Sequence, residues 1–243
     1  MSKSLTDFVP DSLPLTIREH IQTGEVTDKS CSKLATTLYV NQTIPVFLKI
    51  GAKGSLEREM NMSQFLYRYE LGPKIIAYSS SETHDYLLTE ALPGENGTSP
   101  RHLRDPEELA AAFGRYLQKL HSLPTDGCPF PQRTQEMWEE ARRRGAELEG
   151  LMALPYSPKD NVVIHGDYCL PNIIMDRFSL RAFIDLGAGG IGDRHHDLYW
   201  GLWTLHYNLQ TNAYQEIFLN AYGIHDVDPE GLIYFGELNR LLE

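Results

Sequence analysis

The chain has 243 residues, of which 42% are hydrophobic and 23% are charged, and its formal net charge is −11. This composition excludes a largely disordered chain, and the length fits one large domain or two small lobes. The acidic excess argues against a nucleic-acid partner, because binding to phosphates depends on Lys and Arg. It suits a cationic small molecule, although solubility alone explains the same charge.

The sequence contains neither a membrane-span pattern nor a cysteine framework. No apolar run approaches the ~18–20 residues of a span, and the first residues lack the apolar stretch of a signal peptide. The three cysteines, Cys31, Cys128 and Cys169, are odd in number and far apart. Disulfides and cysteine-bound zinc are therefore disfavoured. We expect a cytoplasmic protein with no membrane partner and no obligate protein partner.

The first ninety residues have the pattern of a β-rich lobe with a single helix. Four apolar runs, rich in β-branched and aromatic residues, predict strands at residues 34–40, 44–50, 75–78 and 86–89. The first two strands are expected to form a hairpin around Asn41 and Gln42. A helix is expected over residues 56–71, because Gly72 and Pro73 then end it.

The second part of the chain is predominantly helical. Its start is marked by Pro-Gly-Glu-Asn-Gly at 93–97, the strongest loop signal in the sequence. Asp105 has the features of an N-cap, with proline at the next position and Glu108 at N3, and an apolar helix face follows over 109–120. Further helices are expected at residues 136–151, 197–208, 214–222 and 229–242, and short strands at 161–164 and 182–184.

These patterns predict an α+β fold of two lobes. The small β-rich N-terminal lobe is expected at residues 1–91 and the larger, mainly helical C-terminal lobe at residues 92–243. The groove between two lobes is the ordinary place for a ligand.

The candidate chemistry lies in one stretch of the second lobe. His165-Gly166-Asp167 is followed by Asn172 and, thirteen residues further, by Asp185. One carboxylate and an amide oxygen suit Mg²⁺, and a second carboxylate can orient a hydroxyl and accept its proton. The spacing Asp-x₄-Asn followed by Asp-x-Gly is that of the catalytic and metal loops of the protein-kinase fold. Each residue alone could be a cap or a turn residue, but the ordered set indicates phosphoryl transfer.

The segment from Val163 to Leu202 resembles the aminoglycoside phosphotransferase family, most closely its 3′-phosphotransferase branch. The matching residues are His-Gly-Asp and Cys-Leu-Pro-Asn-Ile within 165–173, Phe-Ile-Asp-Leu-Gly at 183–187, and Gly-Ile-Gly-Asp-Arg at 190–194. The resemblance implies a bilobal protein-kinase-like fold and ATP-dependent transfer of a phosphoryl group to a hydroxyl.

The resemblance also implies a role for each matching residue. Asp167 is then the catalytic base, and Asn172 and Asp185 are the Mg²⁺ ligands. Asp197 braces the catalytic loop, and His165 is structural.

Lys49 and Glu59 are the implied phosphate-binding pair of the N-terminal lobe. Lys49 is the one basic residue of the apolar run at 46–50, and the resemblance makes it the ATP phosphate lysine with Glu59 as its acidic partner. The alternative for Lys49 is a strand residue that faces solvent.

The remaining nucleotide contacts implied by the resemblance are less specific. Phe47 would lie against the adenine ring, or simply pack in the core, and the backbone at Glu90 and Leu92 would hydrogen-bond the base of ATP, with GTP possible. The phosphate loop falls at residues 27–33 without the glycine pattern of protein kinases, and Ser30 and Ser32 are its candidate contacts. A plain polar turn is the alternative.

The acceptor implied by the resemblance is a cationic aminoglycoside, phosphorylated at its 3′-hydroxyl to give antibiotic resistance. The family holds such a polycation by carboxylates of the helical lobe, and residues 201–243 contain six acids and one base. Individual positions nevertheless depart from the family pattern. A metal-loop arginine is replaced by Ala188, and two acidic pairs fall on Tyr207 and Asn208 and on Asn239 and Arg240.

Three alternatives remain open. The acceptor is another small hydroxyl compound, the chain is a nucleotide-binding pseudokinase, or it is a protein kinase. The complete set of catalytic residues argues against a pseudokinase. Asp197 follows Gly187 by only ten positions, with no Ala-Pro-Glu segment, which argues against a protein kinase.

Overall fold

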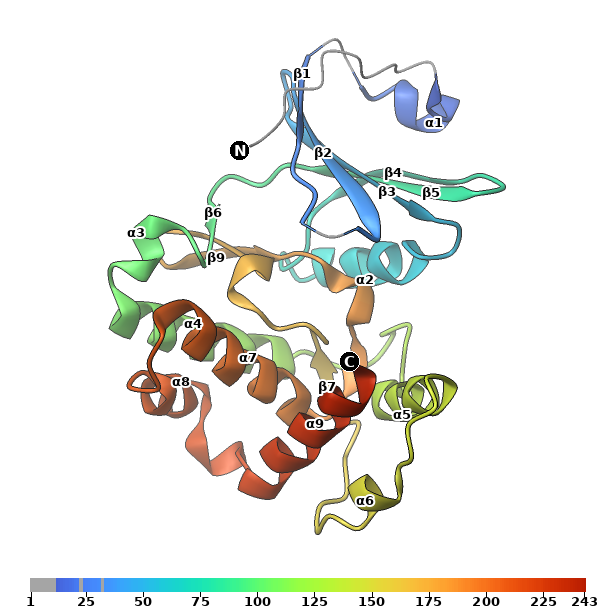
Figure 1. Ribbon diagram of the computed structural model, residues 1–243. Helices are drawn as coiled ribbons and strands as arrows, with labels where there is room; N and C mark the ends of the chain where they lie inside the picture. The colour runs from blue at the N-terminus through green and yellow to red at the C-terminus, as the bar shows by residue number, and fades with distance from the viewer. Residues whose placement is uncertain (1–11, 22–23, 32) are drawn as a thin grey trace. The chain divides into compact units, whose positions relative to one another are not determined.

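The computed structural model describes residues 12–21, 24–31 and 33–243. The chain divides into two compact units, Met1–Pro93 and Gly94–Glu243. The N-terminal unit is built on an antiparallel sheet, and most of the helices belong to the C-terminal unit (Figure 1). The predicted α+β class is confirmed. In the described residues no helix has the length and apolar character needed to cross a membrane.

The N-terminal unit contains a five-stranded sheet of order β1-β2-β3-β5-β4. Its strands are β1 (Glu25–Asp28), β2 (Ala35–Asn41), β3 (Val46–Ala52), β4 (Ile75–Ser80) and β5 (His84–Glu90). The predicted hairpin is β2–β3, with Val40 opposite Val46. Strand β1 was not predicted, because it is short and has a single apolar residue, Val26.

Alternation along β3 gives the sheet two different faces. Val46 and Leu48 are buried in a core that also contains Ile17 of α1 (Leu15–Arg18). Phe47 and Lys49 therefore lie on the opposite face, and both are half-buried. The alternation along β3 thus determines which of its side chains can contact a ligand.

Helix α2 (Glu57–Tyr67) ends four residues earlier than predicted. The backbone N–H of Leu71 donates to the Leu66 carbonyl and that of Glu70 to the Tyr67 carbonyl, and Glu70 has φ of 59°. This is a Schellman-type ending with glutamate in the left-handed position. Gly72 and Pro73 follow the end of the helix but do not form it.

The C-terminal unit contains seven helices within its described residues, which include every position from 94 to 243. They are α3 (Pro100–Leu103), α4 (Pro106–His121), α5 (Arg133–Arg143), α6 (Glu149–Met152), α7 (Arg194–Leu209), α8 (Gln215–Tyr222) and α9 (Pro229–Leu242). Asp105 caps α4 as predicted, by accepting from the Glu108 N–H at 3.3 Å. The single helix predicted over 136–151 is wrong, because the chain turns at Gly145, whose φ is +87°, and forms two helices.

Short strands frame the loops of this unit. One sheet has the order β6-β8-β9, formed by Glu95–Asn96, Ile173–Asp176 and Ser179–Phe183, and the other pairs β7 (Val162–Ile164) with β10 (Gly190–Gly192). Three-residue 3₁₀ turns lie at η2 (Leu170–Asn172), η3 (Leu186–Ala188) and η4 (Ile224–Asp226). The β8–β9 hairpin pairs Ile173 with Phe183. The end of the segment that contains Asp167 and Asn172 therefore lies beside the start of the segment that contains Asp185.

Aromatic packing fixes this region to the helices. The ring of Tyr168 stacks on Phe113 of α4 at a centroid distance of 4.3 Å, and its hydroxyl donates to the Phe113 carbonyl at 2.7 Å. Phe113 also contacts Phe218 of α8, with centroids 5.4 Å apart. The segment that contains Asp167 is therefore anchored in the core by the very next side chain.

Candidate active site

The loop after β7 approaches the η3 turn closely. Gly166 has φ of +82°, and a Cβ atom at this position would lie 2.0 Å from the Ala188 carbonyl oxygen. Only glycine fits here, both for its backbone conformation and for the space. The structure thereby places the Asp167 loop beside the turn that follows Asp185.

The carboxylate of Asp197 holds the backbone of the Asp167 loop. Its Oδ2 accepts from the His165 N–H at 2.6 Å and its Oδ1 from the Gly166 N–H at 2.8 Å. The side chain is fully buried, and His121 Nε2 is 3.2 Å from Oδ2. Burial alone would raise the pKa of Asp197, but the hydrogen bond from His121 and the nearby His165 lower it below its usual value. Asp197 is thus an ionised brace at neutral pH.

Two buried histidines beside Asp197 make stability depend on pH. Burial lowers the pKa of His121 and of His196 below the ordinary 6.5, although Asp197 opposes the shift. The unfolded chain therefore binds more protons below pH 6.5, and stability is lost as the pH falls. We expect the free energy of unfolding to decrease by at most about 1.4 kcal/mol per pH unit for each histidine. Urea denaturation at a series of pH values below 6.5 measures this slope.

Two variants identify the source of that slope. His196→Gln removes one titrating group and should flatten the profile, whereas His225→Gln, at an exposed position in η4, should leave it unchanged. A stability that is constant over this range would contradict the assignment.

Asn172 orients the carboxylate of Asp167. Its Nδ2 donates to the Asp167 backbone carbonyl at 3.0 Å and to Asp167 Oδ2 at 2.9 Å. These two bonds use both amide hydrogens, so the Asn172 Oδ1 atom remains an acceptor. The Asn172 backbone carbonyl accepts from the Ile184 N–H at 2.9 Å, which brings Asn172 next to the residue before Asp185.

Asp185 begins the turn after β9. It adopts the left-handed conformation (φ 60°, ψ 47°), which aspartate tolerates better than most residues. The turn is held from outside by Arg133, whose Nε donates to the Ala188 carbonyl at 2.9 Å and whose guanidinium pairs with Glu136. In this chain Ala188 replaces the metal-loop arginine of the family, and the arginine that supports the loop comes from α5.

These oxygen donors fit Mg²⁺. The ion takes few protein ligands, prefers oxygen and completes its shell with substrate phosphates and water. Asn172 Oδ1 and the Asp185 carboxylate are such a donor set. In residues 12–21, 24–31 and 33–243, no group of three or more His, Cys, Asp or Glu side chains is arranged to hold a metal.

In the N-terminal unit, Lys49 and Glu59 form the ion pair that the family resemblance implied. The Lys49 Nζ lies 2.7 Å from Glu59 Oε2, with side-chain exposures of 21% and 13%. The low exposure reduces screening by water. The pair fixes the lysine on the sheet face opposite the core.

The other candidate nucleotide contacts are arranged as follows. The Phe47 ring lies on the same face, with its centroid 5.2 Å from that of Tyr39. The backbone N–H of Glu90 donates to the Lys74 carbonyl at 3.0 Å and that of Ala91 to the Pro45 carbonyl at 2.9 Å. At the predicted hinge, the Glu90 and Ala91 donors are thus already used, so Leu92 is the candidate N–H donor to a base.

Ser30 already has a structural contact in the loop between β1 and β2. Its Oγ accepts from the Thr37 N–H at 2.9 Å, and its own N–H donates to Asp28 Oδ1 at 2.8 Å. The hydroxyl hydrogen is the part of Ser30 that could still contact a phosphate. Ser32 lies outside the described residues.

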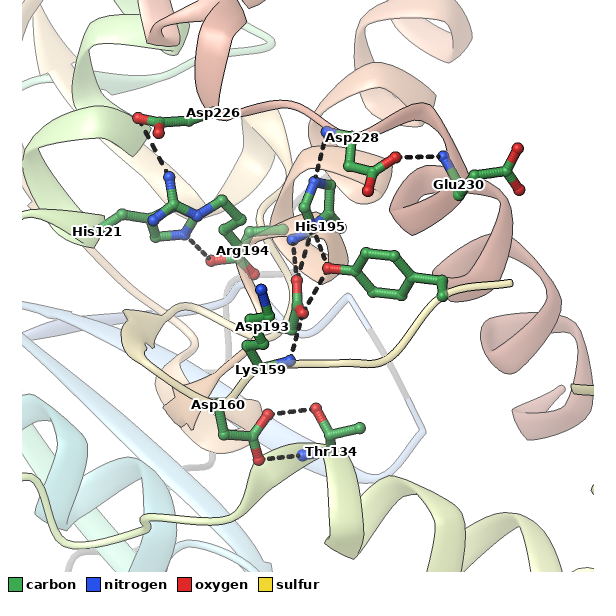
Figure 2. A network of polar contacts seen from close by, with 12 residues as sticks. His121, Thr134, Lys159, Asp160, Asp193, Arg194, His195, Asp226, Asp228 and Glu230 are labelled. Carbon is green, nitrogen blue, oxygen red and sulfur yellow. Dashed lines mark hydrogen bonds and ion pairs between the residues drawn. The ribbon is translucent and has the colours of Figure 1, made fainter. Parts of the chain in front are cut away.

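A buried polar network joins the start of α7 to two distant segments (Figure 2). Asp193 caps α7 by accepting from the His195 N–H, and it also accepts from the Tyr156 hydroxyl and the Lys159 N–H, both at 2.7 Å. His195 Nδ1 donates to Asp193 and its Nε2 accepts from the Asp228 N–H at 2.9 Å. Both ring nitrogens are therefore satisfied by the protein, which gives His195 a structural role.

Three supporting residues were missed by the sequence analysis. His121 contacts Asp197 across 76 residues and Arg133 contacts Ala188 across 55 residues. Thr204 Oγ1 accepts from the Leu170 N–H at 3.3 Å. No local pattern marks these residues, because their contacts form only when the helices pack.

Comparison with known proteins identifies the family of the chain. The description "Phosphotransferase enzyme family" belongs to a family model that matches residues 35–233. A probable aminoglycoside 3′-phosphotransferase of Lactococcus lactis is 29% identical, and the match covers 93% of this chain and 94% of that protein. An aminoglycoside 3′-phosphotransferase of Salmonella typhimurium is 30% identical, and the match covers 77% of this chain and 78% of that protein.

Solved structures share the fold. The crystal structure of an aminoglycoside 3′-phosphotransferase of type VIII superposes with a TM-score of 0.71 at 22% identity, covering 88% of this chain and 91% of that one. The predicted protein-kinase-like fold class is thereby confirmed, as is the resemblance drawn from Val163 to Leu202. The chain belongs to the phosphotransferase enzyme family.

Proposed function

We propose that the chain transfers the γ-phosphoryl group of ATP to a hydroxyl group of a small molecule, with Mg²⁺ as cofactor. The observation that carries the proposal is the pair of hydrogen bonds from Asn172 to Asp167. They orient one carboxylate and leave an amide oxygen for a metal, in a loop braced by Asp197. Both parts are required for phosphoryl transfer.

Asp167 orients the acceptor hydroxyl and accepts its proton. The acceptor oxygen forms a bond to the γ-phosphorus while the bond between that phosphorus and the β–γ bridging oxygen breaks, so that ADP leaves. Asn172 and Asp185 hold the metal, and Mg²⁺ when bound neutralises charge on the phosphates. Because the transition state is loose, positioning and charge neutralisation contribute more than strong base catalysis.

The N-terminal unit binds the nucleotide in this proposal. Lys49, fixed by Glu59, neutralises the α- and β-phosphates, Phe47 lies against adenine, and the Glu90 carbonyl and the Leu92 N–H hydrogen-bond the base. Use of ATP implies a cytoplasmic location. GTP would be accepted if its base satisfies the same backbone groups.

Lys49→Met should raise the KM for ATP by about tenfold or more, because a desolvated cation beside the phosphates is lost. Glu59→Gln should have a smaller effect, since it only loosens the lysine. The exposed Lys53→Met, four residues along the same chain segment, is the control. Steady-state kinetics with varied ATP measures all three, and an unchanged KM in Lys49→Met would contradict the phosphate role.

The favoured acceptor is an aminoglycoside, phosphorylated at its 3′-hydroxyl. Support comes from the names of the relatives and from the acidic excess of residues 201–243. Arg240, which would repel a cation, is paired with Glu237, since its Nε lies 3.0 Å from Oε2. Asn239 is buried and bonds His196, so this departure from the family pattern serves packing.

Coupled ADP release tests the proposal. The assay supplies ATP and Mg²⁺ with kanamycin, neomycin, their 3′-deoxy analogues and several unrelated alcohols. Turnover of the 3′-hydroxyl compounds only, abolished by EDTA and restored by Mg²⁺, is the expected result. Turnover of another alcohol would support the proposed kinase activity and show that the acceptor is not an aminoglycoside. ATP binding without turnover of any acceptor would favour a pseudokinase.

A further inference from the structure

Four aromatic side chains of α7 contact one another in series, from the half-buried Tyr199, which packs against the core, to the exposed Tyr207. This aromatic face consists of Tyr199, Trp200, Trp203 and Tyr207, in chain order. Neighbouring ring centroids are 5.6, 5.5 and 5.0 Å apart, and the last pair, Trp203 and Tyr207, is stacked with planes 10° apart. Trp203 is 43% exposed and Tyr207 60% exposed. Single exposed aromatic residues are common, but a contiguous group marks a binding surface.

The aromatic face adjoins the Asp167 loop. The same helix supplies Asp197, which holds Gly166, and Thr204, which holds Leu170, so Asp167 lies in the segment between these two attachments. Thr204 is four residues after Trp200 and three before Tyr207, and side chains at these spacings are neighbours on a helix surface. The aromatic face therefore flanks Thr204, through which α7 holds the loop that carries the proposed base.

The surroundings of the aromatic face favour a cation. The π face of an indole or phenol ring carries negative potential. Burial raises the pKa of Tyr199, and the carboxylate of Glu243 raises it further, which places a negative charge near one end of the face. Two arginines lie near this end of the chain, and both are paired: Arg240 with Glu237, and Arg144, which also donates to the Leu242 carbonyl, with Glu140.

We infer that the aromatic face is the acceptor-binding surface and that it holds an ammonium-bearing sugar by cation–π contacts and ring stacking. This inference rests on the proposed function and gives it a recognition chemistry. Trp is the strongest cation–π partner among the side chains. Binding by these rings explains how a chain with Tyr207 and Asn208 at two acidic positions of the family pattern can still bind a polycation.

The test is a KM comparison on kanamycin with three variants of the full chain. Trp203→Leu keeps bulk without a π face and should raise the KM for kanamycin about tenfold. Trp203→Phe keeps a weaker π face and should raise it about threefold. In both variants kcat and the KM for ATP should stay within about twofold, because the face binds the acceptor and does not take part in the chemistry.

His206→Ala is the matched control, since His206 is exposed on the same helix outside the aromatic face, and its KM should equal that of the unaltered chain. If the unaltered chain phosphorylates kanamycin and Trp203→Leu has the same KM, the inference is wrong while the proposed function stands. Equal KM values for the Leu and Phe variants would also exclude π-face recognition. Dissociation of a dimer by Trp203→Leu, with KM unchanged, would assign the face to self-association. Absence of aminoglycoside turnover in the unaltered chain would overturn both proposals.

Discussion

Asp167→Asn should lower kcat by about a thousandfold, while ATP binding and the fold persist. The amide has the shape of the carboxylate but cannot accept the proton of the acceptor hydroxyl. The loop should keep its place, because it is held through the backbone N–H groups of His165 and Gly166 and through the buried ring of Tyr168. Coupled ADP release at saturating substrates measures kcat, and calorimetric titration measures nucleotide affinity.

Asp126→Asn is the control for Asp167→Asn. It makes the same chemical change at an exposed loop position and should leave kcat and affinity unchanged. An Asp167→Asn enzyme with kcat within tenfold of the unaltered chain would refute the role of base. Loss of ATP binding in that variant would show that the loop, and not only the proton acceptor, had been altered.

Asp197→Ala should lower the free energy of unfolding by about 4 kcal/mol and abolish turnover. The substitution leaves three buried donors without their acceptor, namely the N–H groups of His165 and Gly166 and the Nε2 of His121. Each unsatisfied buried group costs about 1–3 kcal/mol. Urea denaturation at neutral pH measures the change as a lower midpoint at unchanged slope.

Asp197→Asn separates charge from hydrogen bonding. It retains one oxygen acceptor, so its midpoint should fall between those of Asp197→Ala and the unaltered chain. Asp176→Ala removes an aspartate from a surface ion pair with Arg181 and should leave the midpoint unchanged. A wild-type midpoint for Asp197→Ala would mean that the Asp167 loop is held by other contacts.

Local signals in the sequence predicted the elements whose ends are determined locally. The cap at Asp105 and the helix over 229–242 have the predicted positions. Prediction failed where a residue other than glycine took a left-handed conformation, as at Glu70, or where a glycine interrupted a helical pattern, as at Gly145. Helix propensity does not register the first event, whereas Gly145 is a local stop signal that the prediction of a single helix overlooked.

The candidate site was predictable as an order of residues, not as a set of contacts. The spacing of Asp167, Asn172 and Asp185 reflects two neighbouring loops, and the contacts of Gly166 with Ala188 and of Asn172 with Ile184 bring those loops together. The contacts of His121 from α4 and Arg133 from α5 join residues far apart in the sequence, so no periodic pattern predicts them. The aromatic face has helical spacing, but only the structure shows that packing leaves Trp203 and Tyr207 exposed.

Helix α7 has a consequence for how the substrate range of such an enzyme can change. Asp197 and Thr204 attach the helix to the Asp167 loop, while Trp203 and Tyr207 point away from the core on a neighbouring side. On the inferred role of the aromatic face, substitutions at the exposed positions alter the acceptor surface without disturbing the buried attachments. One rigid element thus separates selection for new substrates from selection for chemistry, and a lineage can explore the first while the second stays intact.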